Sequence, residues 1–212
     1  MPTLQWVQVD AFTTKPFAGN PCAVVFDADD LSAEQMQQIA LEMNLSETAF
    51  LMHSDVADFR ARYFTPAEEI PLAGHPTIAS IFALIESGRL VTNDEPKSIS
   101  LQLEAGVIPV DILIADESPI IRMTQLKPNF MSIHDPEVIM PVLGLTPDDL
   151  MPDMPIQTVS TGTPQLMVPV KSLDVLGRAN VNGAAYRALR AESDFRGPHL
   201  FCTQGATKQG NT

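Results

Sequence analysis

A carboxyl group in the segment NLSETAF is the first candidate for chemistry. Glu47 lies between a predicted helix and an apolar stretch, where Leu45, Ala49 and Phe50 are expected to shield it partly from water. Partial burial makes a carboxyl group a better general acid or base near neutral pH. The position also fits an ordinary surface glutamate at a corner between a helix and a strand. Spacing alone leaves both interpretations open.

An imidazole in the segment AGHPT is the second candidate. His75 lies between Gly74 and Pro76, at the start of a predicted helix. Backbone N–H groups at a helix start have no partner within the helix and can bind an anion, and Gly74 permits close approach of another group. There His75 could pass a proton or hydrogen-bond a carboxylate. It could equally serve only to cap the helix.

The remaining polar candidates have equally good structural explanations. Asn20 lies in a turn from which it could reach the same cleft, although turns often use asparagine for their own geometry. Arg60 and Arg62 share one face of a predicted strand and could bind an acid, or form a solvated face. Glu68 and Glu69 are adjacent, so in a strand they point to opposite faces and cannot act as a carboxylate pair.

A helix with almost no polar face must position the imidazole. From Pro76 to Ile85 apolar residues cover every side of the helical wheel, so the helix must be enclosed by protein or lipid. The run is shorter than the roughly 20 apolar residues that a membrane span needs. We therefore predict a helix buried inside a sleeve of strands, with Pro76 at its first position.

The preceding helix carries explicit start and stop signals. Ser32 and Gln35 form a capping box, Leu31 and Met36 stand at the positions of a hydrophobic staple, and Asn44 suits a left-handed end. This helix has a single apolar stripe, so it is expected to pack on one side only. The sequence thus predicts one outer and one inner helix.

Strands outnumber helices, and hairpin spacing dominates, so the predicted class is α+β with an antiparallel sheet. The strand at 4–9 is expected to be covered on both faces. A turn at 116–119 divides the chain into predicted domains 1–116 and 117–212. Further strands are predicted at 22–26, 48–52, 58–64, 99–103, 107–115, 120–124, 156–160, 165–170 and 200–203, and further helices at 136–143, 173–178 and 183–191.

Composition narrows the classes of function. The chain has 212 residues, of which 45% are hydrophobic and 18% charged, and this excludes a disordered protein. A net charge of −13 disfavours binding to nucleic acid or to anionic membranes. The N-terminus shows no secretory signal, so a cytoplasmic location is expected. No dinucleotide or phosphate-loop motif is present.

The thiols and imidazoles do not form a metal-binding pattern. Cys22 and Cys202 are far apart in the sequence and fit neither a zinc motif nor a disulfide framework, so both are expected to be packed free thiols. The four histidines lack ligand spacing, and no metal site is predicted. An epimerase that uses the two cysteines is a weak alternative.

Three motifs in order carry a family resemblance. DAFT..PFAGNPCAVV, MNLSETAF and YFTPAEEIPLAGHPT together resemble the PhzF-like family of isomerases, named for phenazine biosynthesis. The resemblance implies the diaminopimelate-epimerase fold, in which two similar domains each wrap a mostly antiparallel sheet around a central helix. It implies an active site in the cleft between the domains, no cofactor and a small carboxylic-acid substrate. Homodimers are common in the family.

The resemblance also implies residue roles. By the match of the NLSET motif, Glu47 is the acid/base that transfers the proton, a place that related epimerases give to a cysteine. By the match of the GHPT motif, Gly74 and His75 line the pocket, with His75 assisting catalysis. Ser46, Asn20 and Thr77 are expected to complete the substrate-binding residues.

One departure from the family concerns the second domain. Family members continue into a motif resembling EDPATGSA, whereas this sequence reaches Thr212 without it. The resemblance therefore implies an incomplete second domain with exposed apolar surface. Two functions remain open: a cofactor-independent isomerase, and an inactive family member that acts as a binding or interaction protein.

Overall fold

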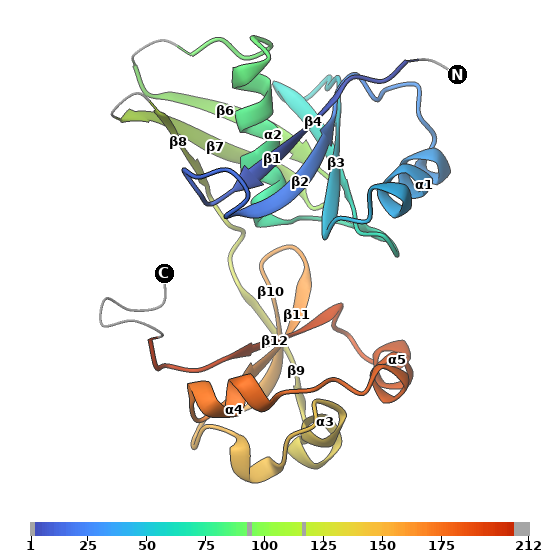
Figure 1. The fold of residues 1–212 in the computed structure, drawn as a ribbon, viewed down its shortest axis with the longest axis vertical. Helices are drawn as coiled ribbons and strands as arrows, with labels where there is room; N and C mark the ends of the chain where they lie inside the picture. Colours follow the sequence, from blue (N-terminus) through green and yellow to red (C-terminus); the bar gives the residue numbers. More distant parts are fainter. Residues whose placement is uncertain (1–2, 93–94, 116–117, 206–212) are drawn as a thin grey trace. The chain divides into compact units, whose positions relative to one another are not determined.

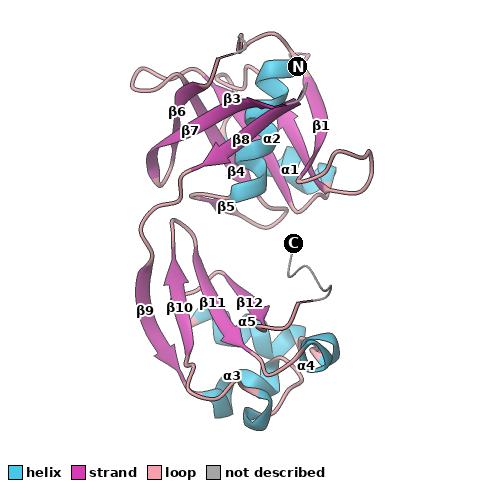
Figure 2. Ribbon diagram, turned by 90° about the vertical axis from the view of Figure 1, so that its left-hand side faces the viewer, coloured by secondary structure: helices cyan, strands magenta, loops and turns pink. Residues whose placement is uncertain are grey.

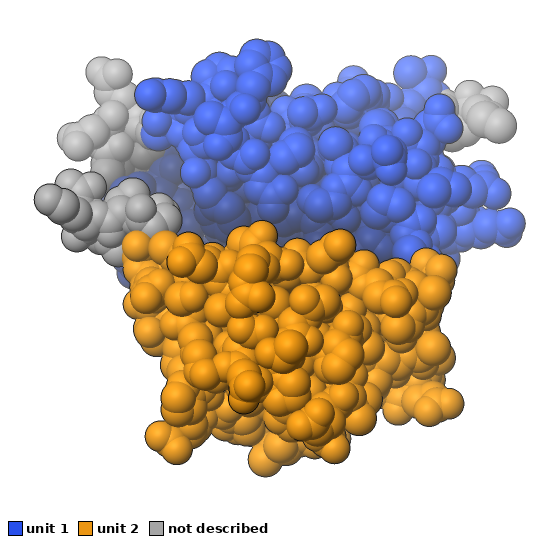
Figure 3. Space-filling view, turned by 60° about the horizontal axis from the view of Figure 1, so that its bottom comes forward, with its two compact units in different colours: residues 1–126 blue, residues 127–212 orange. Residues whose placement is uncertain are grey.

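The computed structural model of the protein describes residues 3–92, 95–115 and 118–205. It divides the chain into two compact units, residues 1–126 and 127–212, which Figure 3 colours separately. The predicted boundary, after residue 116, lies ten residues before the boundary between the two units. Residues 116 and 117 of the predicted turn lie outside the described residues. The strand that follows this turn pairs with the strand before it, and so remains part of unit 1.

Unit 1 is a mixed sheet wrapped around one helix (Figure 1). The strand order is β1-β2-β3-β4-β6-β7-β8, with the short β5 paired to β4. Most neighbours are antiparallel, but β2 with β3 and β4 with β6 are parallel, because a helix connects each of these regions. The strands are β1 (Trp6–Ala11), β2 (Asn20–Val25), β3 (Glu47–Met52), β4 (Phe59–Phe64), β5 (Glu69–Ile70), β6 (Lys97–Leu103), β7 (Gly106–Ala115) and β8 (Ser118–Met123).

The outer helix α1 (Ala33–Met43) forms as its sequence signals predict. Ser32 and Gln35 make the reciprocal capping box, and Asn44 ends the helix in the left-handed conformation at φ 51°. Met36 and Ala40 are fully buried, and they pack with Phe50 and Phe64 on the outer face of β3 and β4. The prediction of a helix that packs on one side is confirmed.

The inner helix α2 (Gly74–Glu86) lies within the curve of the sheet. It begins two residues earlier than predicted, so Pro76 is the third helical residue and His75 belongs to the helix itself. Most of its residues are buried, Ile81 and Ala79 completely. The stripe through Ile78 and Phe82 is only partly buried, because the sheet does not close between β1 and β8.

Two predictions about strand surfaces need revision. The first strand is not covered on both faces: Trp6 is 49% and Val7 40% exposed, because β1 is an edge strand that pairs with β2 alone. The second revision concerns Arg62, whose side chain is 19% exposed and so does not belong to a solvated face. It forms a bidentate ion pair with Glu69 of β5, at 2.7 and 2.6 Å, and lies over the ring of Phe64.

Unit 2 is a four-stranded sheet with its helices on one side (Figure 2). The strand order is β12-β11-β10-β9, and the β9 strand was not predicted. Sheet residues such as Ile156 and Val168 pack against Ile139, Met140 and Phe195. The elements are β9 (Asn129–His134), α3 (Pro136–Val142), a 3₁₀ turn (Pro147–Asp149), β10 (Ile156–Ser160), β11 (Pro164–Pro169), α4 (Leu173–Arg178), α5 (Gly183–Ala191) and β12 (Gly197–Phe201).

The opposite face of the unit 2 sheet presents apolar side chains to solvent. Ile133 pairs with Gln157, and Phe130 pairs with Val159, so these residues point away from the buried Ile156. Phe130 is 67% and Ile133 68% exposed. The exposed apolar surface expected in the second half of the chain is therefore present on this face.

Candidate active site

Strand β3 directs Glu47 toward the inner helix. Side chains alternate along a strand, and Ala49 and Leu51 of β3 belong to the core that surrounds α2. Glu47 lies on their side of the sheet, at the start of the strand, and its side chain is 20% exposed. The local sequence thus places a carboxyl group at the edge of the core, beside the first turn of α2.

Glu47 and His75 meet at that edge. Glu47 Oε2 lies 3.2 Å from His75 Nε2, and the His75 side chain is only 8% exposed. The Glu47 oxygen itself is buried and has no hydrogen-bond partner of good geometry among the described residues. A buried acceptor that lacks a partner is costly, and such groups in folded proteins often have a chemical role.

The surroundings of His75 favour its neutral form. Burial lowers the pKa of the imidazole below its usual 6.5, while the Glu47 carboxylate and the Pro21 carbonyl partly oppose this effect. At neutral pH the ring is therefore uncharged. A neutral imidazole beside a carboxyl group can hold that group in place, and can accept or return its proton.

Ser46 and Asn20 extend the pair toward solvent. The Ser46 hydroxyl donates to Asn20 Oδ1 at 3.3 Å and lies 3.5 Å from His75 Nε2. Both residues are exposed. Asn20, Ser46, Glu47 and His75 therefore form one connected polar group from the starts of β2, β3 and α2.

The first turn of α2 offers free donors beside this group. Its N-cap residue, Ala73, has no side chain that could cap the helix, so the first N–H groups lack a partner within the helix. His75 is consequently not the cap. A Cβ atom added to Gly74 would meet no atom within 4 Å, so the space beside Gly74 is open. These features suit the approach of an anionic group.

Thr77 lies beneath the site instead of at its surface. The residue is fully buried, and its hydroxyl donates to the Ala73 carbonyl at 2.8 Å. The phenol of Tyr63 lies 2.9 Å from the same hydroxyl. The hydroxyl of Thr77 is therefore turned into the core, and the role of Thr77 in substrate binding stays a prediction. Tyr63 was not identified from the sequence, because its contact depends on how β4 packs against α2.

A family model described as phenazine biosynthesis-like protein matches residues 9–209. The chain belongs to the PhzF-like family. It is 35% identical to an uncharacterized isomerase, YfhB, of Bacillus subtilis, over 95% of this chain and 74% of that protein. It is 33% identical to the trans-2,3-dihydro-3-hydroxyanthranilate isomerase of Pseudomonas aeruginosa, over 95% of this chain and 68% of that protein.

Solved structures agree with this membership. A PhzF-family phenazine biosynthesis protein of Bacillus anthracis superposes with a TM-score of 0.80 at 36% identity, over 98% of this chain and 69% of that one. A hydroxyproline epimerase of Agrobacterium vitis shares the fold at a TM-score of 0.57 and 14% identity. The predicted α+β, epimerase-like fold class is confirmed, and this PhzF-like chain spans roughly 70% of its matched relative from B. anthracis.

The thiol alternative is inconsistent with the site. Cys22 is fully buried, and burial raises the pKa of its thiol to about 12, with the nearby Glu47 acting in the same direction. A thiol in that state supplies no thiolate at neutral pH. Cys202 belongs to the core of unit 2. The predicted packed free thiols are thus what the structure contains.

Three further observations concern what the described residues could bind. A hollow of about 940 Å³ lies between β1, β8 and the Ile78 and Phe82 side chains of α2, and neither Glu47 nor His75 lines it. In the described part of the chain, no group of three or more His, Cys, Asp or Glu side chains is arranged to hold a metal ion. None of the described helices has the length and apolar run needed to cross a bilayer.

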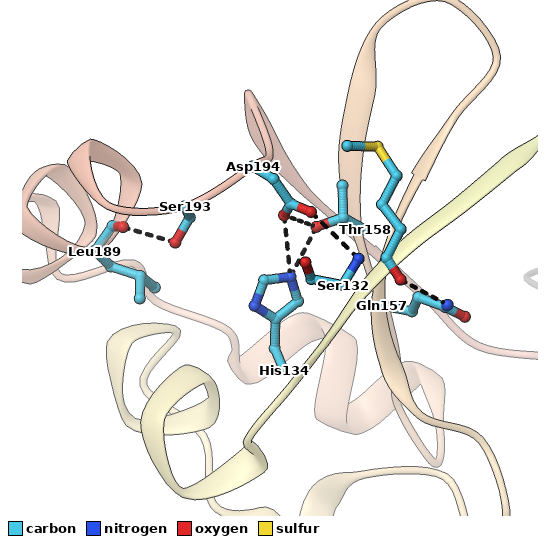
Figure 4. Close-up of polar contacts among 8 residues, drawn as sticks. Ser132, His134, Gln157, Thr158, Leu189, Ser193 and Asp194 are labelled. Atoms are coloured by element: carbon cyan, nitrogen blue, oxygen red, sulfur yellow. Dashed lines mark hydrogen bonds and ion pairs between the residues drawn. The ribbon is translucent and has the colours of Figure 1, made fainter.

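Unit 2 of this PhzF-like chain contains a second polar cluster (Figure 4). His134 Nε2 lies 2.7 Å from the Thr158 hydroxyl, which donates to Asp194 Oδ1 at 2.6 Å. The Ser132 amide donates to the same carboxylate at 3.2 Å. Thr158 is fully buried, so the cluster attaches the segment after α5 to strands β9 and β10. Its members are distant in the sequence, and no local pattern predicts it.

Proposed function

We propose that this protein is a cofactor-independent isomerase of the PhzF type, in which Glu47 transfers a proton on a small carboxylic acid. The observation that supports this most strongly is the Glu47 Oε2 atom, which is buried, lacks a hydrogen bond, and lies 3.2 Å from a neutral imidazole. Membership of a family whose relatives are named isomerases supports the same reaction class.

The reaction needs one group that removes a proton from carbon and returns it at another carbon. In the proposed mechanism the Glu47 carboxylate takes the proton, and the electron pair left on carbon is delocalised into the substrate carboxyl group. The free N–H groups at the start of α2 stabilise the charge that develops there. His75 holds Glu47 in position, and the protonated Glu47 then returns its proton to the second carbon.

Substrate binding is assigned to the exposed part of the same group. Asn20 and Ser46 offer polar side chains next to Glu47, and the open space at Gly74 allows a carboxylate to approach the backbone. A cytoplasmic location and homodimer formation belong to this proposal as well. They rest on the family resemblance and not on a contact in the structure.

Solvent exchange tests the proposal. The protein is incubated in D₂O with trans-2,3-dihydro-3-hydroxyanthranilate, the substrate of the P. aeruginosa relative, and with a panel of small amino acids. We expect deuterium to enter at least one acid, and Glu47→Gln to reduce its rate about 100-fold or more. Glu42→Gln, an exposed residue of α1, is the matched control and should leave the rate unchanged. Equal rates in wild type and Glu47→Gln would exclude this role. If no acid takes up label, the protein is a binding or interaction member of the family.

A further inference from the structure

A buried chain of hydroxyl groups lies directly under the site. The Tyr63 ring is 1% exposed, and its hydroxyl lies 2.9 Å from the Thr77 hydroxyl. Thr77 gives its one hydroxyl proton to the Ala73 carbonyl at 2.8 Å, so Tyr63 must be the donor in the first contact. Burial also raises the pKa of the phenol above its usual value, which keeps it protonated.

The hydroxyl groups of Tyr63 and Thr77 connect to the first turn of α2, which carries His75. Ala73 is the N-cap residue and offers no side chain for capping, while Thr77 stands one turn further along. The two residues flank His75 in the sequence, and the hydroxyl chain links both of them to β4. The first turn of a helix is its least supported part, so an external tie has most effect there.

The same phenol is fixed to the strand that carries Glu47. Tyr63 pairs directly with Ala49 across β3 and β4, and Ala49 is two residues from Glu47 on the same face. Tyr63, Cys22 and Ala49 share one packed cluster around α2. One rigid ring therefore spans the two elements that supply Glu47 and His75.

We propose that Tyr63 is a positioning residue, which holds the first turn of α2 against β3 and β4 and so keeps His75 in contact with Glu47. The inference rests on the proposed function of that pair. Tyr63 touches no substrate in this account and acts only through Thr77 and the helix start. Its hydroxyl group determines the position of the imidazole.

Tyr63→Phe tests the proposal without a known substrate. The titration of His75 is followed by NMR, with His75→Asn used to assign its signal. In wild type the ring faces Glu47, the Ser46 hydroxyl and the Pro21 carbonyl, and burial is the largest influence on its pKa. When the first turn loosens, the ring gains hydration, which raises its pKa, and moves away from Glu47, which lowers it. Burial is the larger of the two influences, so we expect the His75 pKa to rise toward 6.5. An unchanged or lower pKa overturns the proposal.

The second tyrosine provides a matched control. Tyr186 in unit 2 is likewise hydrogen-bonded through its hydroxyl, which donates to the Arg196 carbonyl at 2.9 Å. Tyr186→Phe removes the same atom from a hydrogen-bonded tyrosine far from His75 in the sequence, and it should leave the His75 pKa unchanged. If both substitutions shift the His75 pKa equally, the effect is general destabilisation, and the positioning role is wrong.

Substitutions at Thr77 extend the test to the exchange rate. Thr77→Ser keeps the hydroxyl and should retain the wild-type rate, whereas Tyr63→Phe and Thr77→Val should each lower it about tenfold. Thr77→Val removes the Thr77 acceptor of the buried phenol, and this variant can fail to fold. The double variant Tyr63→Phe/Thr77→Val, which removes both hydroxyl groups, then takes its place in the test. Wild-type rates in these variants contradict the proposal. If wild type itself exchanges no label, the proposed function fails, while the NMR titration still decides the role of Tyr63.

Discussion

The sheets of the two units are covered by helices in different ways. In unit 1 the sheet encloses α2, and Ile81 of that helix is completely buried. In unit 2 the helices α3, α4 and α5 cover one face, and Ile133 on the other face is 68% exposed (Figure 2). The candidate site belongs to the unit that contains the enclosed helix, because the start of that helix supplies both His75 and the free N–H groups.

The largest expected effect is a loss of stability in unit 1, measured against the same isoleucine-to-alanine change in unit 2. Ile81→Ala leaves a cavity around α2 and should lower the free energy of unfolding by about 3 kcal/mol. Ile133→Ala on the open face should cost less than about 0.5 kcal/mol. Urea unfolding of each variant measures both values. A large loss from Ile133→Ala would mean that this face is covered in solution, and the contrast between the units would fail.

A second prediction separates chemistry from stability in unit 1. Gly74→Ala places a methyl group in the open space where the substrate carboxylate would approach, so the exchange rate should fall about 10- to 100-fold. The melting temperature should be unchanged or slightly higher, because alanine favours a helix over glycine.

Gly177→Ala in α4 of unit 2 is the control for that change, since an added Cβ there also meets no atom within 4 Å. This substitution should alter neither the exchange rate nor the fold. A wild-type exchange rate in Gly74→Ala would show that no substrate group approaches the start of α2.

The third prediction concerns pH. The pKa of His75 is lowered in the folded protein, so the unfolded chain binds a proton more readily at this residue. Unit 1 should therefore lose stability as the pH falls from 6.5 through the folded pKa of His75. His75→Asn should remove this part of the pH dependence in thermal unfolding between pH 5 and 8. An identical pH profile in the variant would contradict the assigned burial of His75.

The smallest expected effect lies in the polar cluster of unit 2. Partial burial by itself would raise the pKa of Asp194, but hydrogen bonds from Thr158 and Ser132 outweigh it and lower the pKa. This carboxylate stabilises the fold above its unfolded pKa of about 3.8 and loses that effect as the pH falls further. Asp194→Asn should cost about 1 kcal/mol at pH 7 in urea unfolding. No loss at pH 7, or a loss that persists at pH 2, would contradict this account.

Local signals in the sequence predicted much of the fold. The capping box of Ser32 and Gln35 set the start of α1, and Asn44 set its end, because these contacts lie within one turn of the chain. The start of α2 was predicted two residues late, since the preference of proline for the first position was given more weight than packing. The exposure of Trp6 depends on strand order, which the sequence alone does not reveal.

The candidate site shows the same limit. The spacing of Glu47 and His75 gave no reason to expect contact, and only the family resemblance placed them in one pocket. Two sets of contacts depend on the register between distant strands: the hydrogen-bonded hydroxyl groups of Tyr63 and Thr77, and the cluster of His134, Thr158 and Asp194. No local pattern encodes that register, so the structure was needed to find both.

The titration of His75 in Glu47→Gln tests the central claim, that these two residues form one coupled pair. The Glu47 carboxylate raises the pKa of His75 against the larger effect of burial. Removing that charge should therefore lower the His75 pKa below its wild-type value. An unaltered or higher His75 pKa in Glu47→Gln would show that the two groups do not interact, and would contradict the account.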